Sequence, residues 1–388
     1  MYTMLIILVQ ILAWSSICYV LFAMWRLLRF AGRVCVVDAP TPPVTILKPV
    51  CGLDQDLYEN LRTFCEQDYP GYQVIFGVYD EADPAIAVIE KLMRALPGKD
   101  LSMVIDDRLI GTNRKVSNLA NMYASAKYEI LVIADSDMQV GPDYLRSIVA
   151  PFRDGMVGAV TCLYTGISRG GLASTLGAAF INEWFVPSVL VALSFREINF
   201  CFGSTMVVRR EILEQLGGFA RFSSLLADDY MLGKLVSDAG YRVCLSPYVV
   251  GNVVYEPDIR RLFLHELRWA ATIRQVQPLG YSCSFITYCI PMSLLYFAVS
   301  PYLIDGMITL AGAILLRMLM HFTARYSLGI KGRAQPWLSP LRDILCFTIW
   351  AVGLFNRNVH WRQHTYALKS EGRLEITEQQ KLSEDIIS

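Results

Sequence analysis

The sequence predicts an α/β domain built on a largely parallel sheet, with membrane segments on both sides of it. Short runs rich in β-branched residues alternate with stretches that carry apolar residues at helical spacing, an order typical of such a sheet. The apolar excess is concentrated towards the two ends of the chain, although 35 basic and 35 acidic residues are also present. The expected strands are 44–48, 73–79, 101–105 and 129–134, and the expected helices are 57–65, 84–96 and 114–126.

A transmembrane anchor is predicted at the beginning of the chain. Residues Met4 to Trp25 carry no charge, and at about 1.5 Å per residue a helix of this length crosses a hydrocarbon core of about 30 Å. A signal peptide is the alternative, but the run is long for one and no clear cleavage site follows, so an uncleaved anchor is expected. Arg26, Arg29 and Arg33 follow directly, and the positive-inside rule then places the next domain in the cytoplasm.

Three apolar runs near the other end predict a return to the bilayer. They cover 282–304 and 306–322, hinged at Asp305, and a shorter stretch over 344–355. The third run falls short of a ~20-residue span, so a tilted or re-entrant segment is expected and the topology after Arg342 stays open. Basic residues favour the cytoplasm for the loop before this run and for the tail after it: Arg325, Lys331, Arg333, Arg357, Arg362 and Lys369.

Charge and cysteine usage restrict the classes of ligand expected for the central domain. The balanced charge argues against a nucleic-acid partner, because a phosphate backbone requires a basic stripe. The ten cysteines include no Cys-x-x-Cys pair and mostly lie among apolar residues, so reduced, buried thiols are expected rather than a zinc site. The expected organisation is an anchor over 1–26, a proline-rich linker over 38–43, a cytoplasmic domain over 38–280, membrane helices over 281–356 and a polar tail over 357–388.

An acidic pair follows the strand expected over 129–134. Asp135 and Asp137 lie two positions apart, and alternate residues of an extended segment point the same way. Both carboxylates can therefore face one divalent cation such as Mg²⁺, whose other ligands are typically water and phosphate oxygens. A strand that simply runs into a polar turn is the alternative. Asp80 ends another strand, and because ligands bind at the carboxyl ends of strands in such sheets, one crevice can hold Asp80 and Asp135.

Six motifs resemble a known enzyme family when they are taken in order. The motifs are "VYDEADPA", "NRKVSNL", "ADSD", "FGSTMVVRR", "ADDYMLG" and "HELRW", and they resemble the membrane-bound inverting glycosyltransferases related to ceramide glucosyltransferase. Within that group, "LKPVCGLDQDLYENL", "INEWFVPSVLVAL" and "HELRWAATIRQVQPLGY" are most similar to bacterial hopanoid-biosynthesis glycosyltransferases. The resemblance runs from Pro43 to Tyr281. It implies a Rossmann-like GT-A domain that binds a nucleotide sugar.

The resemblance assigns the donor site to residues at these strand ends. Asp80 would meet the nucleotide base and ribose, and Asp135 and Asp137 would hold Mg²⁺ or Mn²⁺ against the diphosphate. Lys115 opens a helix and could place a cation near a phosphate, with Asn118 orienting it, although a solvated lysine is the alternative. Asp83, close to Asp80, is expected instead to cap the helix that begins at Pro84.

The resemblance also implies the residues that act on the acceptor. Asp229 matches the general base, which would activate a hydroxyl for in-line attack, and Asp228 would support it. A plain helix start is the alternative for this acidic pair. Arg268 would pair with the diphosphate, and Trp269 would stack on the sugar or cap the pocket. His265 departs from the family's usual Gln or Arg, so it is left as either a structural donor or a ligand.

Residues 172–193 have the length and apolar composition of a transmembrane helix. Glu183 is their only ionisable residue, but a span here would put Asp229 and Asp135 on opposite sides of the membrane. One or two interfacial helices are therefore expected, where an apolar face can meet a lipid acceptor. Glu183 and Trp184 would lie near the acceptor entrance, with a solvated charge as the alternative for Glu183.

The sequence thus predicts an inverting, metal-dependent glycosyltransferase that moves a single sugar from a UDP-sugar to a membrane lipid. The resemblance implies a multi-pass protein of the bacterial inner membrane whose catalytic domain faces the cytoplasm. It points to N-acetylglucosamine and bacteriohopanetetrol as donor sugar and acceptor, and glucose onto ceramide is the alternative. A processive polysaccharide synthase is disfavoured, because the few predicted membrane spans would form only a small channel for a growing polymer. A non-catalytic membrane scaffold with the same fold is the alternative from another class.

Overall fold

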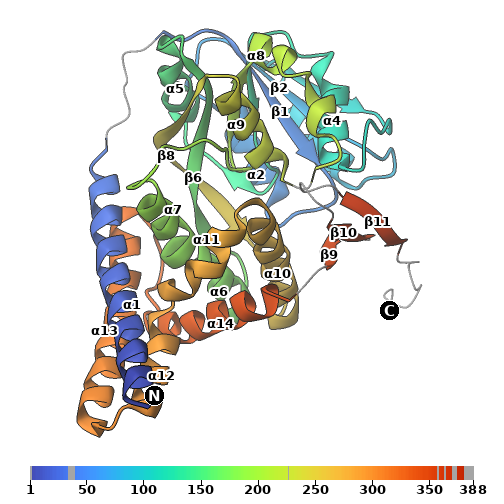
Figure 1. Cartoon of the computed structure of the whole chain (residues 1–388). Helices are drawn as coiled ribbons and strands as arrows, with labels where there is room; N and C mark the ends of the chain where they lie inside the picture. Colours follow the sequence, from blue (N-terminus) through green and yellow to red (C-terminus); the bar gives the residue numbers. More distant parts are fainter. Residues whose placement is uncertain are drawn as a thin grey trace.

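The structure is a computed structural model that describes residues 2–33, 40–225 and 227–355, together with the backbone of three short strands beyond them. An eight-stranded sheet forms the centre of the molecule, in the order β3-β2-β1-β4-β7-β6-β8-β5 (Figure 1). Its strands are β1 (Val44–Val50), β2 (Tyr72–Val78), β3 (Leu101–Ile105), β4 (Ile130–Ile133), β5 (Met138–Gln139), β6 (Val157–Ser168), β7 (Met206–Arg209) and β8 (Arg242–Val254).

The first half of the sheet is parallel and the second half is mixed. Ile46 of β1 pairs in register with Val74 of β2 and Val132 of β4. Val74 also pairs with Leu101 of β3, so the four strands expected from the sequence are confirmed. Every residue of β1 is buried, as expected for a parallel strand with helices on both faces. The mixed half was not predicted: β7 runs antiparallel to β4 and β6, and β8 runs parallel to β6.

Helices cover both faces of the sheet. One apolar core lies under α2, α3 and α5, and another lies under α4, α8 and α9. At Gly77 of β2 the packing leaves no space for a side chain, because a Cβ there would lie 2.2 Å from Asn118 Oδ1 of α4. These helices are α2 (Leu57–Cys65), α3 (Ala85–Ala95), α4 (Arg114–Tyr123), α5 (Tyr144–Val149), α8 (Arg210–Gln215) and α9 (Asp228–Asp238).

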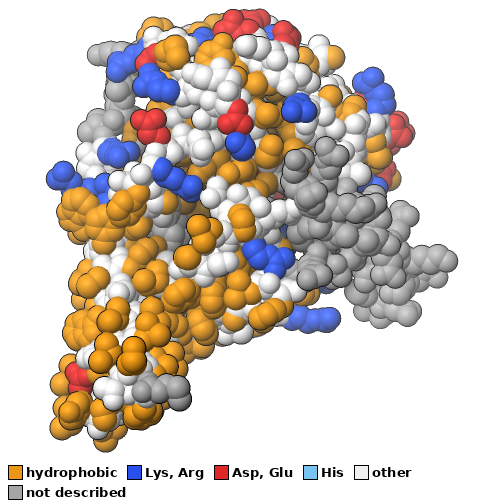
Figure 2. Space-filling view, in the orientation of Figure 1, with side chains coloured by type: hydrophobic (Ala, Val, Ile, Leu, Met, Phe, Trp, Pro, Cys, Tyr) orange, Lys and Arg blue, Asp and Glu red, His pale blue; other side chains and the backbone are white. Residues whose placement is uncertain are grey.

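A column of apolar helices extends from one end of the sheet. In Figure 1, α1 (Tyr2–Ala31) and α13 (Leu303–Ser327) run side by side, with α12 (Cys289–Val299) next to them. Figure 2 shows that hydrophobic side chains cover this column. Within the described residues, α1, Leu172–Ala192 and α13 are long and apolar enough to cross a membrane, and the bent pair Pro278–Thr287 and Cys289–Val299 would add a fourth span.

The turn between the last two column helices differs from the sequence prediction. It lies at residues 300–302, so Asp305 belongs to the first turn of α13 and is not a hinge. The Tyr296 hydroxyl of α12 donates a hydrogen bond to the Asp305 carboxylate, which explains how a charge is held there. The apolar run predicted over 344–355 forms α14 (Leu338–Gly353), a helix of 16 residues that lies across the column in Figure 1.

The segment 172–193 forms one continuous helix with a π-helical turn. It comprises α6 (Leu172–Phe180), the turn Ile181–Phe185 and α7 (Val186–Ala192). The helix packs on β6, while α7 also contacts α1 and the π turn contacts α13. It therefore lies between the α/β domain and the apolar column, and its interfacial position in a membrane stays a prediction.

Two helices link the domain to the column. Three short strands come after α14 in the chain. The helices α10 (Ile259–Val276) and α11 (Pro278–Cys283) precede the column, and α10 packs against α6 and α14. The residues expected as a polar tail include β9 (Asn358–Trp361), β10 (His364–Leu368) and β11 (Leu374–Gln379), which form a separate antiparallel sheet.

Candidate active site

The acidic loop after β4 is held in place by the mixed half of the sheet. The Asn252 amide of β8 donates a 2.8 Å hydrogen bond to Asp137 Oδ2, and Val253 N–H donates to the Asp137 carbonyl. Burial, together with the charges of Asp135 and Asp54, raises the pKa of Asp137 to about 7. Several negative charges are thus gathered at the end of β4, where a cation would relieve their repulsion.

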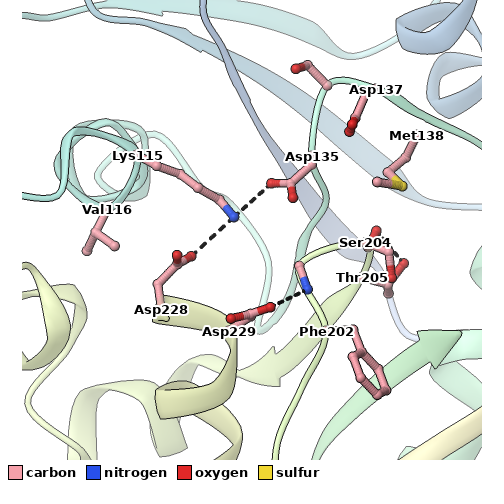
Figure 3. A network of polar contacts seen from close by, with 12 residues as sticks. Lys115, Val116, Asp135, Asp137, Met138, Phe202, Ser204, Thr205, Asp228 and Asp229 are labelled. Carbon is pink, nitrogen blue, oxygen red and sulfur yellow. Dashed lines mark hydrogen bonds and ion pairs between the residues drawn. The ribbon is translucent and has the colours of Figure 1, made fainter. Parts of the chain in front are cut away.

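Lys115 supplies a cation that joins two acidic segments. Its Nζ lies 2.7 Å from Asp135 Oδ1 and 3.2 Å from Asp228 Oδ2, so it stands between β4 and α9 (Figure 3). Burial alone would lower the pKa of Lys115, but the surrounding carboxylates raise it well above its usual value. The Asn113 side chain caps α4 by accepting from Val116 N–H, and it also donates to the Leu225 carbonyl just before α9.

Asp229 is fixed by two backbone donors. Gly203 N–H donates to Asp229 Oδ2 and Tyr230 N–H donates to Oδ1, both at 2.8 Å. Burial first, and then the charge of Asp228, raises the pKa of Asp229 to about 6, while Lys115 opposes the shift. The carboxylate is therefore oriented and more basic than an exposed aspartate.

Gly203 lies between the two acidic groups that the sequence predicts for metal binding and catalysis. A Cβ at this position would lie 2.9 Å from Asp135 Oδ2 and 3.4 Å from Asp229 Oδ2. A larger residue would have to displace one of these carboxylates, so glycine allows Asp135 and Asp229 to approach the same point. Gly203 was not among the residues predicted from the sequence, although it lies inside the motif "FGSTMVVRR".

Lys48 is a second cation that the sequence analysis missed. It is fully buried in β1, its ammonium group donates to the Asp135 backbone carbonyl, and its Nζ lies 3.7 Å from the centre of the Phe64 ring. Burial lowers the pKa of Lys48 to about 7. A lysine in the middle of an otherwise apolar strand was the available signal, since such a residue is rarely fully buried without a partner.

The other residues predicted to bind the nucleotide sugar make no direct contact with Lys115, Asp135 or Asp229 in the interactions described below. Asp80 is exposed after β2, and it accepts a local hydrogen bond from Ala82 N–H at 2.9 Å, so its nucleotide role stays a prediction. Asp83 accepts from Ala85 N–H at 2.8 Å, consistent with its expected role at the start of α3. Asn118 donates to the Gly77 carbonyl at 2.8 Å and so ties α4 to β2, whereas the sequence analysis expected it to orient Lys115.

Contacts of the "HELRW" side chains, residues 265–269, hold α10 in place. His265 Nδ1 lies 2.6 Å from Glu256 Oε1, which favours the structural role for this histidine. The Trp269 ring stacks on Phe180 of α6 with 5.9 Å between ring centres, so a helix contact accounts for part of its surface. Glu266 forms a buried ion pair with Arg342 of α14. Arg268 is half-buried on the same helix.

The two residues expected at the acceptor entrance are buried. Glu183 is 3% exposed and its Oε1 lies 2.7 Å from His321 Nδ1 of α13, so the alternative of a solvated charge is wrong. Trp184 is 4% exposed and packs under the Arg317 guanidinium, 3.9 Å from the ring centre. Both side chains hold the helices together, because the π turn directs them towards α13.

A family assignment follows from the sequence comparison. The sequence profile of glycosyl transferase family 21 matches residues 8–374. The chain belongs to this family. It is 22% identical over 357 residues to ceramide glucosyltransferase 3 of Caenorhabditis elegans, covering 87% of this chain and 75% of that protein. Ceramide glucosyltransferase 1 of the same organism is 26% identical over 212 residues, which are 54% of this chain and 45% of that protein.

The structural comparison agrees with the GT-A fold that the sequence predicted. The mannosyltransferase PcManGT from Pyrobaculum calidifontis, solved in complex with GDP-Man and Mn²⁺, superposes with a TM-score of 0.55 at 19% identity. The match covers 90% of this chain and 99% of that one. The GT-A-type α/β domain with apolar helices at both ends is therefore confirmed, and the protein is a family 21 glycosyltransferase.

The chemistry of the acidic loop is compatible with a divalent cation. Asp135 and Asp137 offer two carboxylates, and Mg²⁺ or Mn²⁺ can complete its shell with phosphate oxygens and water. No cluster of three or more Cys, His, Asp or Glu side chains arranged for a metal occurs in the part of the chain that the structure describes.

The buried pair between α10 and α14 gives a test of how this helix is held. Glu266→Leu leaves Arg342 buried without its carboxylate and should lower the free energy of unfolding by about 3–5 kcal/mol. The double variant E266L/R342M should recover most of the loss, because Glu266 Oε1 and Arg342 Nη1 already lack hydrogen-bond partners among the described residues. Thermal melting of the detergent-solubilised protein checks both expectations. A double variant no more stable than the single one would contradict this interpretation.

Proposed function

We propose that this protein transfers a single sugar from a UDP-sugar to a hydroxyl group of a membrane lipid, with inversion at the anomeric carbon. The observation that carries the proposal is the convergence of Lys115, Asp135 and Asp229 around Gly203. Three distant segments thereby combine a phosphate-binding cation, a metal-binding acid and an oriented base. These are the groups that a transfer from a nucleotide sugar requires.

The donor would bind at the carboxyl edge of the parallel strands. Asp80 would contact the uracil and ribose, and Lys115 and Arg268 would neutralise the diphosphate. Mg²⁺ or Mn²⁺ held by Asp135 and Asp137 would take up charge as the diphosphate leaves. Asp228 pairs with Lys115 and would keep the Lys115 ammonium group near the nucleotide sugar.

Asp229 would accept the proton of the acceptor hydroxyl. The hydrogen bonds from Gly203 and Tyr230 hold its two oxygens in a defined direction, so little reorganisation is needed when the hydroxyl arrives. Its raised pKa of about 6 makes it a stronger base than an exposed aspartate while it remains ionised at neutral pH. Attack from the side opposite to the diphosphate inverts the anomeric carbon. Trp269 would border the sugar or the pocket entrance.

Two acceptor and donor pairs deserve a direct comparison. The motif strings favour N-acetylglucosamine and bacteriohopanetetrol, and with them a bacterial inner membrane as the location. The names of the curated relatives favour glucose and ceramide as the second candidate. Both acceptors are lipids that present a hydroxyl at the membrane surface. The multi-pass topology with a cytoplasmic catalytic domain is proposed from the arginines that follow the apolar part of α1.

A substrate panel tests the proposal directly. The purified protein is incubated with Mg²⁺ or Mn²⁺ and a set of UDP-sugars, with hopanoid polyols and ceramide as acceptors, and the lipids are analysed by mass spectrometry. We expect one N-acetylhexosamine to be added to the hopanoid and little product without the metal. A hexose on ceramide would instead support the second candidate. UDP-sugar binding without product from any pair would refute both acceptors.

A substitution at Asp229 separates an enzyme from a non-catalytic scaffold. Asp229→Asn keeps the shape of the side chain but removes the base, so transfer should fall by roughly 10²–10⁴-fold while UDP-sugar binding changes little. Asp238→Asn at the exposed end of the same helix is the matched control and should keep wild-type activity. Turnover and donor affinity are measured for both variants. Equal turnover in wild type and Asp229→Asn would rule out this base.

The pKa of Asp229 also predicts the pH dependence. Only the ionised carboxylate can accept a proton, so kcat/KM should be halved near pH 6 and should fall about tenfold for each further unit of acidification. Above pH 7 the base is fully ionised and this group causes no further change. A pH–rate profile of the wild-type enzyme with saturating metal checks the acidic limb. A rate that stays constant down to pH 4 would assign the proton transfer elsewhere.

A further inference from the structure

A basic cavity lies beside the C-terminal end of α1, away from the proposed transfer site. It has a volume of about 640 Å³ and is bounded by α1, by the segment after α7 and by the beginning of β8. An adjoining hollow of about 450 Å³ shares two arginines with it. The arginines that line the two spaces are Arg26, Arg29, Arg33, Arg196 and Arg242.

Among the residues that the structure describes, most of this positive charge has no carboxylate partner. Arg242 pairs with Asp154, and Glu197 is the single acidic residue among the described residues that line the larger cavity. The other arginines form no carboxylate ion pair with any residue that the structure describes. Arg26 donates from Nε to the Leu190 carbonyl, which joins α1 to α7 and fixes the cavity wall. The cavity is therefore suited to an anion.

Aromatic side chains place the cavity at the level of the membrane surface. Trp25 is 49% exposed and Phe195 is 79% exposed, and Phe22 packs against both. Exposed aromatic rings at the end of an apolar helix are typical of the boundary between lipid and water. The guanidinium groups of Arg26 and Arg29 lie over the Trp25 ring, at 5.7 and 5.8 Å from its centre. Figure 2 shows basic side chains where the apolar column meets the domain.

We propose that this cavity binds the phosphate of an anionic phospholipid head group from the membrane that holds α1. A guanidinium fork matches phosphate oxygens, and arginines beside a membrane surface attract anionic lipids. Free phosphate shares this chemistry, but only a lipid adds acyl chains that contact the exposed rings of Trp25 and Phe195. The inference depends on the membrane placement of α1 and not on the transfer reaction.

The cavity is connected to the transfer site by two segments. The chain that forms its wall at Phe195 and Arg196 continues to Gly203, which donates to Asp229. The helix α9 has Asp229 at one end and Ser237, another lining residue, about 12 Å away at the other end. A bound head group would therefore steady the backbone that orients the base.

The test measures lipid binding without turnover. The detergent-purified full chain is titrated with dioleoyl phosphatidylglycerol or dioleoyl phosphatidylcholine and examined by native mass spectrometry. We expect a saturable phosphatidylglycerol adduct and no comparable phosphatidylcholine adduct. R33Q/R196Q should weaken the phosphatidylglycerol adduct roughly 30-fold, which corresponds to about 1 kcal/mol for each arginine. R62Q/R94Q removes the same charge from exposed positions on α2 and α3, outside the cavity lining, and should bind as wild type does.

Further experiments exclude misfolding of the variants and binding of free phosphate as explanations. R33K/R196K keeps the charge and should restore most of the binding, and R33Q/R196Q should melt at the wild-type temperature. Excess inorganic phosphate should not displace the lipid. Equal binding of the two lipids, unchanged phosphatidylglycerol binding in R33Q/R196Q, no rescue by R33K/R196K, or displacement by phosphate would overturn the proposal. Because none of these readouts uses a sugar donor, a failure here is distinct from a failure of the proposed transfer reaction.

Discussion

The interaction of Lys115 with Asp135 and Asp228 connects the two halves of the α/β domain. Asp135 ends a strand of the parallel half, whereas Asp228 begins a helix that packs on the mixed half. Without a cation between them, these carboxylates and that of Asp229 would repel one another in a poorly solvated space. The same ammonium group keeps the pKa of Asp229 from rising further. One lysine thus influences both the shape of the candidate site and the pKa of Asp229, its proposed base.

The parts of this site that are local in sequence could be predicted. Asp135 and Asp137 follow an apolar strand at a spacing of two, and strand ends meet at one edge of a parallel sheet. The role of Gly203 could not be assigned in this way, because it arises from its closeness to Asp135 across distant segments. For Lys48 the apolar strand was a local signal of burial, but its contact with the Asp135 carbonyl was not local. The mixed half of the sheet was missed for a similar reason. The strand β7 has four residues, and its antiparallel pairing with β4 depends on tertiary packing.

Buried polar pairs join the apolar helices to the domain. Glu183 pairs with His321 of α13, and Glu266 of α10 pairs with Arg342 of α14. The sequence showed Glu183 only as an isolated charge in an apolar run, so a solvated position was a reasonable alternative. The partners of Glu183 and Glu266 lie 138 and 76 residues away, beyond the reach of any local pattern. Such pairs contribute little net stability but are costly to break, and they therefore favour one arrangement of the helices.

The π-helical turn at Ile181–Phe185 has a geometric consequence for the long helix that contains it. One additional residue in a turn rotates everything beyond it by about 100° relative to a regular α-helix. The half before the turn packs against α10 and α14, whereas the half after it packs against α1. The helix consequently presents two differently directed faces, as two separate helices would, without an intervening loop. The π turn thereby lets one helix contact both α1 and α10, the helix that carries Arg268.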